Sequence, residues 1–188
     1  RVPDVDTIYR VPAQLHSEGM DEAVCRFFGI DTAAHPINME KWKNFLEAYD
    51  HPEGEVRIAV VGKYATFQEA YKSIAESFKH AGAVNKVGVK LDWIESERLE
   101  EEDPSAVLAG YSGILVPGGF GSRGTEGKIA AVKYAREHKV PFLGICLGLQ
   151  MAVVEASRNL LGYVDANSTE FNLETKAPVI HLIREWKN

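Results

Sequence analysis

The stretch that decides the fold is Phe142-Leu143-Gly144-Ile145-Cys146-Leu147-Gly148-Leu149-Gln150. It reads as a short strand, then Gly-x-Cys-x-Gly, then the start of a helix, which is the cysteine form of a nucleophile elbow. The turn of such an elbow is so tight that the positions two before and two after the nucleophile can hardly carry a side chain, and here both are glycine. We therefore expect Cys146 to project from the end of a strand with a strained backbone.

Cys146 is accordingly the candidate nucleophile of an α/β enzyme that attacks an amide or acyl carbon. The N-terminus of the following helix favours a negatively charged thiolate, and the N–H of Leu147 can donate to the oxyanion that the attack creates. The alternative is a buried, inert cysteine, the usual state of a free thiol. Gly144 and Gly148 at this spacing favour the nucleophile.

A second oxyanion donor is expected from a loop after another strand, in Ile114-Leu115-Val116-Pro117-Gly118-Gly119-Phe120-Gly121. Consecutive glycines expose a backbone N–H and let it approach a substrate. An ordinary glycine-rich turn is the alternative, and the motif alone does not decide between them. A phosphate-binding loop is excluded, because the G-x-x-x-x-G-K-[ST] pattern is absent.

From residue 56 onward, strand-like apolar segments alternate with segments whose apolar residues recur at helical spacing. This alternation predicts βαβ units with right-handed crossovers, and hence an α/β fold around a mostly parallel sheet. Cys146 and Gly118 then lie beyond the carboxyl ends of strands, where such sheets form their sites. The expected strands are 56–61, 87–93, 113–116 and 140–145, and the expected helices are 67–78, 97–109, 127–138 and 147–161.

Residues 1–55 form a different region. Two short helices are expected at 20–28 and 39–49, and the polar stretch 50–55 reads as a linker, so we place a domain boundary there. The chain begins without Met and stops directly after a strand-like run, and we interpret it as a piece of a longer protein.

Composition narrows the class of protein. The 188 residues, 45% hydrophobic and 26% charged, are typical of a globular protein of one domain plus an appendage. A net charge of −6 argues against a nucleic-acid partner, and no apolar stretch approaches the roughly 20 residues that span a bilayer. Cys25 and Cys146 make neither a disulfide framework nor a metal site, which indicates a reducing, cytoplasmic environment.

Three segments together resemble the class I glutamine amidotransferases: Leu115–Gly121, Gly144–Gln150 and Asn167–Phe171. Within that class, the chain is more narrowly similar to the CTP synthase family. The narrower resemblance rests on Asp4–Tyr9, Val61–Tyr64, Pro117–Gly121, Arg123-Gly124-x-Glu126-Gly127 and Ala166–Phe171.

The resemblance implies a three-layer, flavodoxin-like amidotransferase domain over residues 56–188, truncated at its C-terminus. Residues 1–55 would be the tail of a synthetase domain and an interdomain linker. L-glutamine would be hydrolysed through a Cys146 glutamyl thioester, and the ammonia used for ATP-dependent amination of UTP to CTP in pyrimidine nucleotide biosynthesis. ATP and Mg2+ would bind the synthetase domain of the same polypeptide, GTP would be an allosteric activator, and a homotetramer is expected.

By the same resemblance, the N–H groups of Gly119 and Leu147 are the oxyanion donors, and Gly148 and Leu149 belong with them to the oxyanion and substrate-binding residues. Gln150 and Glu170 would hold glutamine, Glu170 through the α-ammonium group. The residues alone leave other interpretations open: Gln150 as a solvent-facing residue of a first helical turn, and Glu170 as a solvated carboxylate.

Arg123, Gly124, Glu126 and Gly127 correspond to the lid region associated with GTP activation in that family. Taken without the resemblance, Arg123 and Glu126 are an ordinary charged loop. No metal ligand is expected in this chain.

A cysteine hydrolase also needs a base, normally a histidine oriented by a carboxylate. In this class the pair is His-x-Glu, well downstream of the cysteine, so we expect it beyond residue 188. His51-Pro52-Glu53 has the same form but precedes the nucleophile, and His181 lies in an expected strand at 178–183, so neither is favoured. The P-loop of a synthetase is absent as well.

Two other functions stay open. One is a different enzyme with a cysteine elbow, either a small hydrolase or another amidotransferase; Gln150 with Ser168-Thr169-Glu170 argues against the hydrolase, and residues 1–9 and 61–64 against the other amidotransferase. The second is a catalytically incomplete amidotransferase-like module that acts in binding or assembly. The intact Gly-x-Cys-x-Gly argues against this module, whereas the missing base keeps it open.

Overall fold

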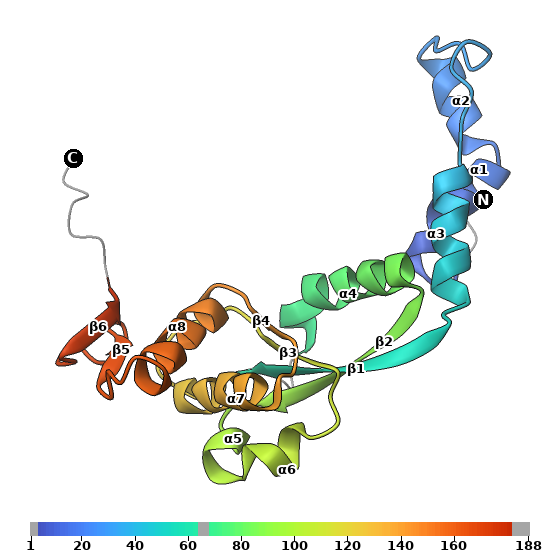
Figure 1. The fold of residues 1–188 in the computed structure, drawn as a ribbon. Coiled ribbons are helices and arrows are strands. Elements are labelled where there is room, and N and C mark those ends of the chain that lie inside the picture. Colours follow the sequence, from blue (N-terminus) through green and yellow to red (C-terminus); the bar gives the residue numbers. More distant parts are fainter. Residues whose placement is uncertain (1–3, 64–67, 182–188) are drawn as a thin grey trace, which may run out of the picture. The chain divides into compact units, whose positions relative to one another are not determined.

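The computed structural model describes residues 4–63 and 68–181 (Figure 1). Contacts divide the chain into two compact units, one of residues 1–55 and 77–88 and one of residues 56–76 and 89–188. The boundary placed at residue 55 stays a prediction. Tyr64, Phe67 and the chain from Leu182 to Asn188 lie outside the described residues. Among the described helices, none has the length and apolar character needed to cross a membrane.

Between residues 4 and 50, the regular elements of the N-terminal unit are all helices. The 3-10 helix η1 (Ile8–Arg10) leads into α1 (Val11–Ser17), and α2 (Met20–Phe27) and α3 (Glu40–Asp50) follow. The last two confirm the predicted helices at 20–28 and 39–49. Helix α1 is not among the predicted ones, although Pro12 stands in its first turn, where proline costs no hydrogen bond.

Tyr9 lies at the centre of this unit's core and is 7% exposed. The rings of Phe45 and His80 pack against it with centroid separations of 5.2 and 5.1 Å. Trp42 Nε1 donates to the Tyr9 carbonyl oxygen over 2.7 Å, and the Tyr9 hydroxyl lies 2.7 Å from His80 Nε2. These contacts join η1, α3 and the second half of α4 (Lys72–Asn85).

The main sheet has four strands in the order β2-β1-β3-β4. Pairing is parallel between β1 and β3 and between β3 and β4. The Ser96 N–H donates to the Gly62 carbonyl oxygen over 2.8 Å, and the Glu53 N–H to that of Lys86 over 2.7 Å, so β2 also runs parallel to β1. The predicted parallel sheet is therefore confirmed. The strands are β1 (Gly54–Gly62), β2 (Val87–Glu95), β3 (Gly113–Val116) and β4 (Phe142–Gly144).

β4 is an outer strand of the described sheet, and its Leu143 side chain is 56% exposed. β3, which lies between β1 and β4, is buried along its whole length, as expected for a central parallel strand.

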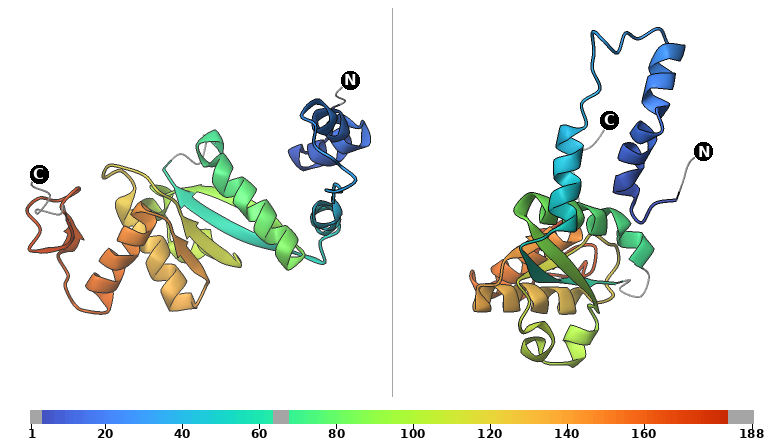
Figure 2. Two further views of the ribbon diagram at one scale, coloured as in Figure 1. Left: turned by 90° about the horizontal axis from the view of Figure 1, so that it is seen from above. Right: turned by 90° about the vertical axis from the view of Figure 1, so that its right-hand side faces the viewer.

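Helices connect the strands. Between β1 and β2 lie η2 (Gln68–Tyr71) and α4, and α7 (Thr125–His138) connects β3 to β4. Helix α8 (Leu147–Asn159) follows β4 and lies beside α7 (Figure 2). Because β1→β2 and β2→β3 step in opposite directions along the sheet, right-handed crossovers place helices on both of its faces.

The predicted single helix at 97–109 is wrong. The chain forms two short helices instead, α5 (Arg98–Glu101) and α6 (Pro104–Leu108). Pro104 stands in the first turn of α6, and proline disfavours helical backbone at the residue before it. The Asp103 side chain then accepts from the Ser105 N–H and caps the new helix.

Two apolar clusters form the core of the second unit. One joins β1, β2 and β3 to α5, α6 and α7 through residues such as Val61, Ile94 and Tyr134. The other joins Ile129 of α7 to Leu147, Met151 and Val154 of α8, with Phe171, Val179 and Ile180 packed against them. The last two residues belong to a separate parallel pair of strands, β5 (Ala166–Ser168) and β6 (Ala177–Ile180).

The strand expected at 178–183 is confirmed in part by β6, whereas β5 is not among the predicted strands. β5 has only three residues, too few for a periodic pattern.

An ion pair joins α7 to α8. Arg136 Nη2 lies 2.8 Å from Oε1 of Glu155, and Nε donates to both carboxylate oxygens over 3.1 and 3.2 Å. Glu155 is 1% exposed and also accepts from Asn159 Nδ2 over 3.0 Å. The hydrogen bond with this carboxylate raises the pKa of Arg136.

We expect Arg136→Ala to destabilise the protein, because it leaves the Glu155 carboxylate buried without its cation. Arg98→Ala, which removes the solvent-exposed pair with Glu102, is the matched control and should change stability far less. The midpoint of urea denaturation measures both. Equal shifts of the two midpoints would contradict a structural role for the Arg136 pair.

Candidate active site

Cys146 occupies the turn between β4 and α8, with φ 51° and ψ −107°. A residue other than glycine in this region carries about 1–3 kcal/mol of strain, which the surrounding structure must hold in place. Three hydrogen bonds fix the turn: Ile145 N–H to Val116 O over 2.9 Å, Gly148 N–H to Ile145 O over 2.9 Å, and Gln150 N–H to Cys146 O over 3.1 Å. Cys146 itself is exposed, so the thiol is accessible.

The two glycines of the motif are each required by a close approach of backbone. A β carbon at Gly144 would lie 2.5 Å from the carbonyl carbon of Gly148. A β carbon at Gly148 would overlap the carbonyl oxygen of Val116 at the end of β3. The Gly-x-Cys-x-Gly spacing therefore lets α8 begin directly against the sheet.

The Gly118–Gly119 loop passes beside this turn. A β carbon at Gly118 would lie 3.5 Å from Cys146 Cβ, and one at Gly119 would lie 3.5 Å from Leu147 Cδ2. Within residues 4–63 and 68–181, neither the Gly119 N–H nor the Leu147 N–H donates a hydrogen bond. Both N–H groups therefore have no protein acceptor among the described residues, and their predicted role as oxyanion donors stays a prediction.

Glu170 lies at the same loop. Its Oε1 accepts from the Gly121 N–H over 3.0 Å, and its own N–H donates to Ser168 Oγ over 3.1 Å. Ser168 is 2% exposed and ends β5. The structure thus brings a carboxylate from beyond α8 to the glycine-rich loop after β3.

The sequence of this region also matches a known protein family. The family model described as glutamine amidotransferase class-I matches residues 66–185. The chain belongs to the class I glutamine amidotransferases. The predicted fold class is thereby confirmed.

Curated relatives of this amidotransferase include CTP synthases. Those of Methylorubrum populi and Brucella melitensis are 53% and 55% identical to it over 183 residues, which make up 97% of this chain and 33% of each relative. The chain thus spans about a third of the length of these relatives. A solved structure, the Trypanosoma brucei CTPS glutaminase domain with bound acivicin, matches with a TM-score of 0.65 and 43% identity, over 71% of this chain and 52% of that one.

Leu149 and Gln150 lie in the first turn of α8 in this amidotransferase. Leu149 is 59% exposed, whereas the Gln150 side chain is half-buried. Gln150 lies four positions after Cys146, so both stand on one side of the helix start. Their predicted roles at the substrate stay predictions.

The four residues of the predicted lid region make contacts within the chain. Arg123 Nε lies 2.9 Å from Glu97 Oε1, and Arg123 Nη2 donates to the Lys63 carbonyl oxygen over 2.7 Å. Gly124 and Gly127 pack so closely on Ser96 that a β carbon at either would overlap it.

Glu126, the fourth residue of this region, pairs with Arg158 of α8 over 2.8 Å. These contacts describe an ordered turn; its role in activation by GTP stays a prediction.

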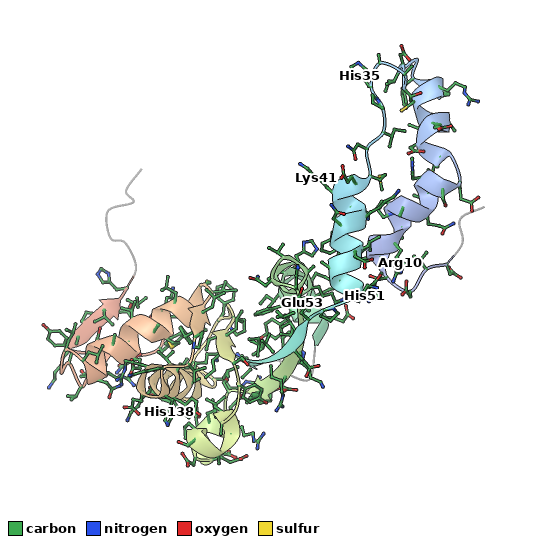
Figure 3. All side chains as sticks on the ribbon, turned by 45° about the vertical axis from the view of Figure 1, so that its right-hand side comes forward. Arg10, His35, Lys41, His51, Glu53 and His138 are labelled. Atoms are coloured by element: carbon green, nitrogen blue, oxygen red, sulfur yellow. The ribbon has the colours of Figure 1, made fainter. Side chains whose placement is uncertain are left out.

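No histidine in the described part of the amidotransferase is hydrogen-bonded to Cys146. His51 ends α3 with Nε2 3.8 Å from Glu47, and Glu53 pairs with Lys86 over 3.0 Å, both within the N-terminal unit (Figure 3). His138 stacks on Tyr134 at the end of α7, with ring centroids 4.1 Å apart. His181 is exposed directly after β6.

Lys128 is a residue of this region that the sequence does not predict. It stands in the first turn of α7 and is 2% exposed, although lysine is rarely buried. Burial lowers its pKa below the usual value. Glu97 and Glu100 oppose this shift, and Lys63 and Arg123 add to it. The only signal in the sequence is the flanking pair Gly124 and Gly127, which indicates a close backbone approach.

We expect Gly148→Ala to lower the free energy of unfolding by about 3 kcal/mol, because the new methyl group overlaps a backbone oxygen that cannot move aside. Gly54→Ala is the matched control: no atom lies within 4 Å of its β carbon, so its effect should stay within about 0.5 kcal/mol. Urea denaturation measures both variants. A Gly148→Ala protein as stable as the control would refute the close approach of α8 to β3.

The lowered pKa of Lys128 predicts a pH dependence of stability. An unfolded lysine keeps its proton up to a pH of about 10.4, and the folded protein releases it at lower pH. In that interval the unfolded state binds more protons, so the free energy of unfolding rises with pH. Wild type should therefore gain stability relative to Lys128→Met as the pH is raised from about 7 towards 10.

The measurement is urea denaturation of both proteins at a series of pH values. A stability difference that does not change with pH would show that Lys128 titrates alike in the folded and unfolded states.

Proposed function

We propose that this chain is the glutaminase part of a CTP synthase. The observation that carries the proposal is the strained Cys146 turn, which packs beside the Gly118–Gly119 loop. The identity of 53–55% with CTP synthases, over nearly the whole chain, supports that family above other amidotransferases.

In the proposed reaction, the Cys146 thiolate attacks the side-chain amide carbon of glutamine. A carbon–sulfur bond forms, and the π electron pair of the carbonyl moves onto its oxygen, where the Gly119 and Leu147 N–H groups stabilise the charge. The tetrahedral intermediate then expels ammonia and leaves a glutamyl thioester. Water attacks the thioester, glutamate leaves, and the thiolate returns.

The proton that ammonia carries away must be delivered by an acid–base group. We propose that a His and a Glu take this role, as in the class that the sequence resembles, because none of the described histidines is hydrogen-bonded to Cys146. Cys146 can form the new bond by itself, but turnover needs this proton transfer.

Two side chains are proposed to hold the glutamine. Glu170 stands at the glycine-rich loop through its hydrogen bond from Gly121, and its carboxylate would pair with the α-ammonium group of the substrate. Gln150 lies one turn of α8 beyond Cys146 and would donate to or accept from the bound glutamine.

The activity of the whole protein is part of the proposal. Ammonia from this domain would aminate UTP to CTP at the expense of ATP, which makes the protein a cytoplasmic ligase of pyrimidine nucleotide biosynthesis. The synthetase domain would belong to the same polypeptide, and the assembly would be a homotetramer. GTP would activate the reaction at the region of Arg123, Gly124, Glu126 and Gly127.

Neither the described residues nor the sequence motifs point to an ATP–Mg2+ site in this part of the protein. The described residues contain no group of three or more His, Cys, Asp or Glu side chains that could hold a metal ion, and the sequence has no P-loop. In the proposal, ATP and Mg2+ would bind the synthetase domain, as the resemblance implies.

A second candidate function follows from the absence of a histidine at Cys146 among the described residues. The domain would then be a catalytically incomplete module that acts in binding or assembly. Such a module would neither form the thioester nor supply ammonia.

We expect Cys146→Ala in the full-length protein to reduce glutamine-dependent CTP formation at least about 10³-fold, because the nucleophile is lost. CTP formation from added ammonia should stay within about twofold of wild type, since the ammonia-using step does not involve the thiol. The measurement is the rate of CTP formation from UTP and ATP with either nitrogen source. Cys25→Ala is the control and should behave like wild type with both.

Labelling with acivicin separates the two functions. Intact mass and peptide mapping should give one adduct, on Cys146, that excess glutamine prevents. Loss of both glutamine and ammonia activities in Cys146→Ala, or no glutamine-protected adduct on the wild type, would refute the glutaminase assignment.

A further inference from the structure

Burial and the dipole of α7 both disfavour a positive charge on Lys128. It is 2% exposed and stands in the first turn of α7, at the positive end of the helix dipole. A buried cation needs compensating contacts. None of the bond-making steps of the proposed glutaminase reaction uses Lys128. Its contacts are therefore the guide to its role.

The ammonium group of Lys128 donates to three acceptors on other residues. Nζ lies 3.3 Å from Ser96 Oγ, 3.3 Å from the Arg123 carbonyl oxygen and 3.2 Å from the Gly124 carbonyl oxygen. A lysine ammonium has three N–H bonds, so all of them are satisfied. Two of the acceptors are backbone oxygens, and the cation therefore fixes the course of the main chain at residues 123 and 124.

These acceptors come from the ends of different strands. Ser96 follows β2, and its N–H is held by Gly62, the last residue of β1. Arg123 and Gly124 close the loop that follows β3. Ser96 Oγ also lies 3.4 Å from Glu97 Oε2, and the other oxygen of Glu97 pairs with Arg123. Lys128 is thus the buried centre of a polar network at the carboxyl ends of three strands.

The loop between β3 and α7 needs such an anchor. It contains Gly118, Gly119 and Gly121, and glycine leaves the backbone more conformational freedom than any other residue. β3 holds the first end of the loop, and Lys128 holds the second. Between them, Phe120 O accepts from Lys63 Nζ over 3.2 Å and Gly121 donates to Glu170.

We propose that Lys128 is a positioning residue of the glutaminase reaction: its ammonium holds the end of the glycine-rich loop, so that the Gly119 N–H faces the oxyanion formed at Cys146. This inference rests on the proposed function. Lys128 does not touch the reacting atoms; it acts through the backbone of Arg123 and Gly124.

The test compares Lys128→Met with Lys133→Met in the full-length protein. Lys133 is exposed on the same helix, and its replacement controls for loss of a positive charge from α7. For Lys128→Met we expect kcat of glutamine hydrolysis to fall about 10- to 100-fold, less than the effect of about 10²–10³ seen when an oxyanion donor is removed outright. KM for glutamine should change less than about threefold, because the loss concerns the transition state. Lys133→Met should keep both values.

The rate of Cys146 alkylation by iodoacetamide distinguishes this role from a general structural defect, because such a defect would change the alkylation rate as well. Displacement of iodide at a saturated carbon creates no oxyanion, so its rate should stay within about twofold of wild type in Lys128→Met. An equal fall in alkylation and in kcat would overturn the proposal, and so would an unchanged kcat. If the wild-type protein itself hydrolyses no glutamine, the proposed function fails first and this inference with it.

If Lys128→Met does not fold, Ser96→Ala tests the positioning role of Lys128 instead. It removes one acceptor of the ammonium and leaves the two backbone acceptors in place. We expect kcat to fall about three- to tenfold with alkylation unchanged. A kcat equal to that of wild type would overturn the proposal.

Discussion

The start of α8 can reach the end of β3 only because Gly148 has no side chain. This contact with the Val116 carbonyl oxygen sets the position of everything around the thiol. The turn at Cys146 that precedes this contact has a strained conformation, and the Gly118–Gly119 loop packs against Cys146 and Leu147. Backbone packing of a strand and a helix therefore sets the position of Cys146 and of the Leu147 N–H.

Different forces order the two halves of this site. The elbow lies on an apolar base, since Leu147 and Met151 of α8 are buried in the same cluster as Ile129 of α7. Polar contacts hold the glycine-rich loop, with Lys128 at one end and Glu170 near the middle. Hydrophobic burial thus fixes the helix that follows Cys146, and hydrogen bonds restrain the neighbouring loop.

Much of this arrangement follows from local sequence. The alternation of apolar strands and helical periodicity predicts the parallel sheet, and Gly144 and Gly148 predict the elbow, because each signal lies within a few neighbouring residues. The break of the predicted helix 97–109 has a local cause as well, because Pro104 disfavours helical backbone at the residue before it. Lys128 could not be found in this way. Its burial depends on Ser96, which lies 32 positions away and on another strand end, and no local pattern distinguishes it from a solvated lysine. The hydrogen bond between Gly121 and Glu170, 49 positions apart, is hidden for the same reason.

The position of β4 has a practical consequence for anyone who handles this polypeptide by itself. An outer strand offers a row of backbone donors and acceptors to any strand that approaches it, and Leu143 here adds an exposed apolar side chain, with Leu149 and Val153 exposed on the helix that follows. At high concentration, copies of the chain could therefore pair with one another through the exposed edge of β4. Solubility tags, low expression temperature or charged substitutions at Leu143 and Val153 are therefore the sensible starting points for producing material, and light scattering during purification would reveal the self-association early.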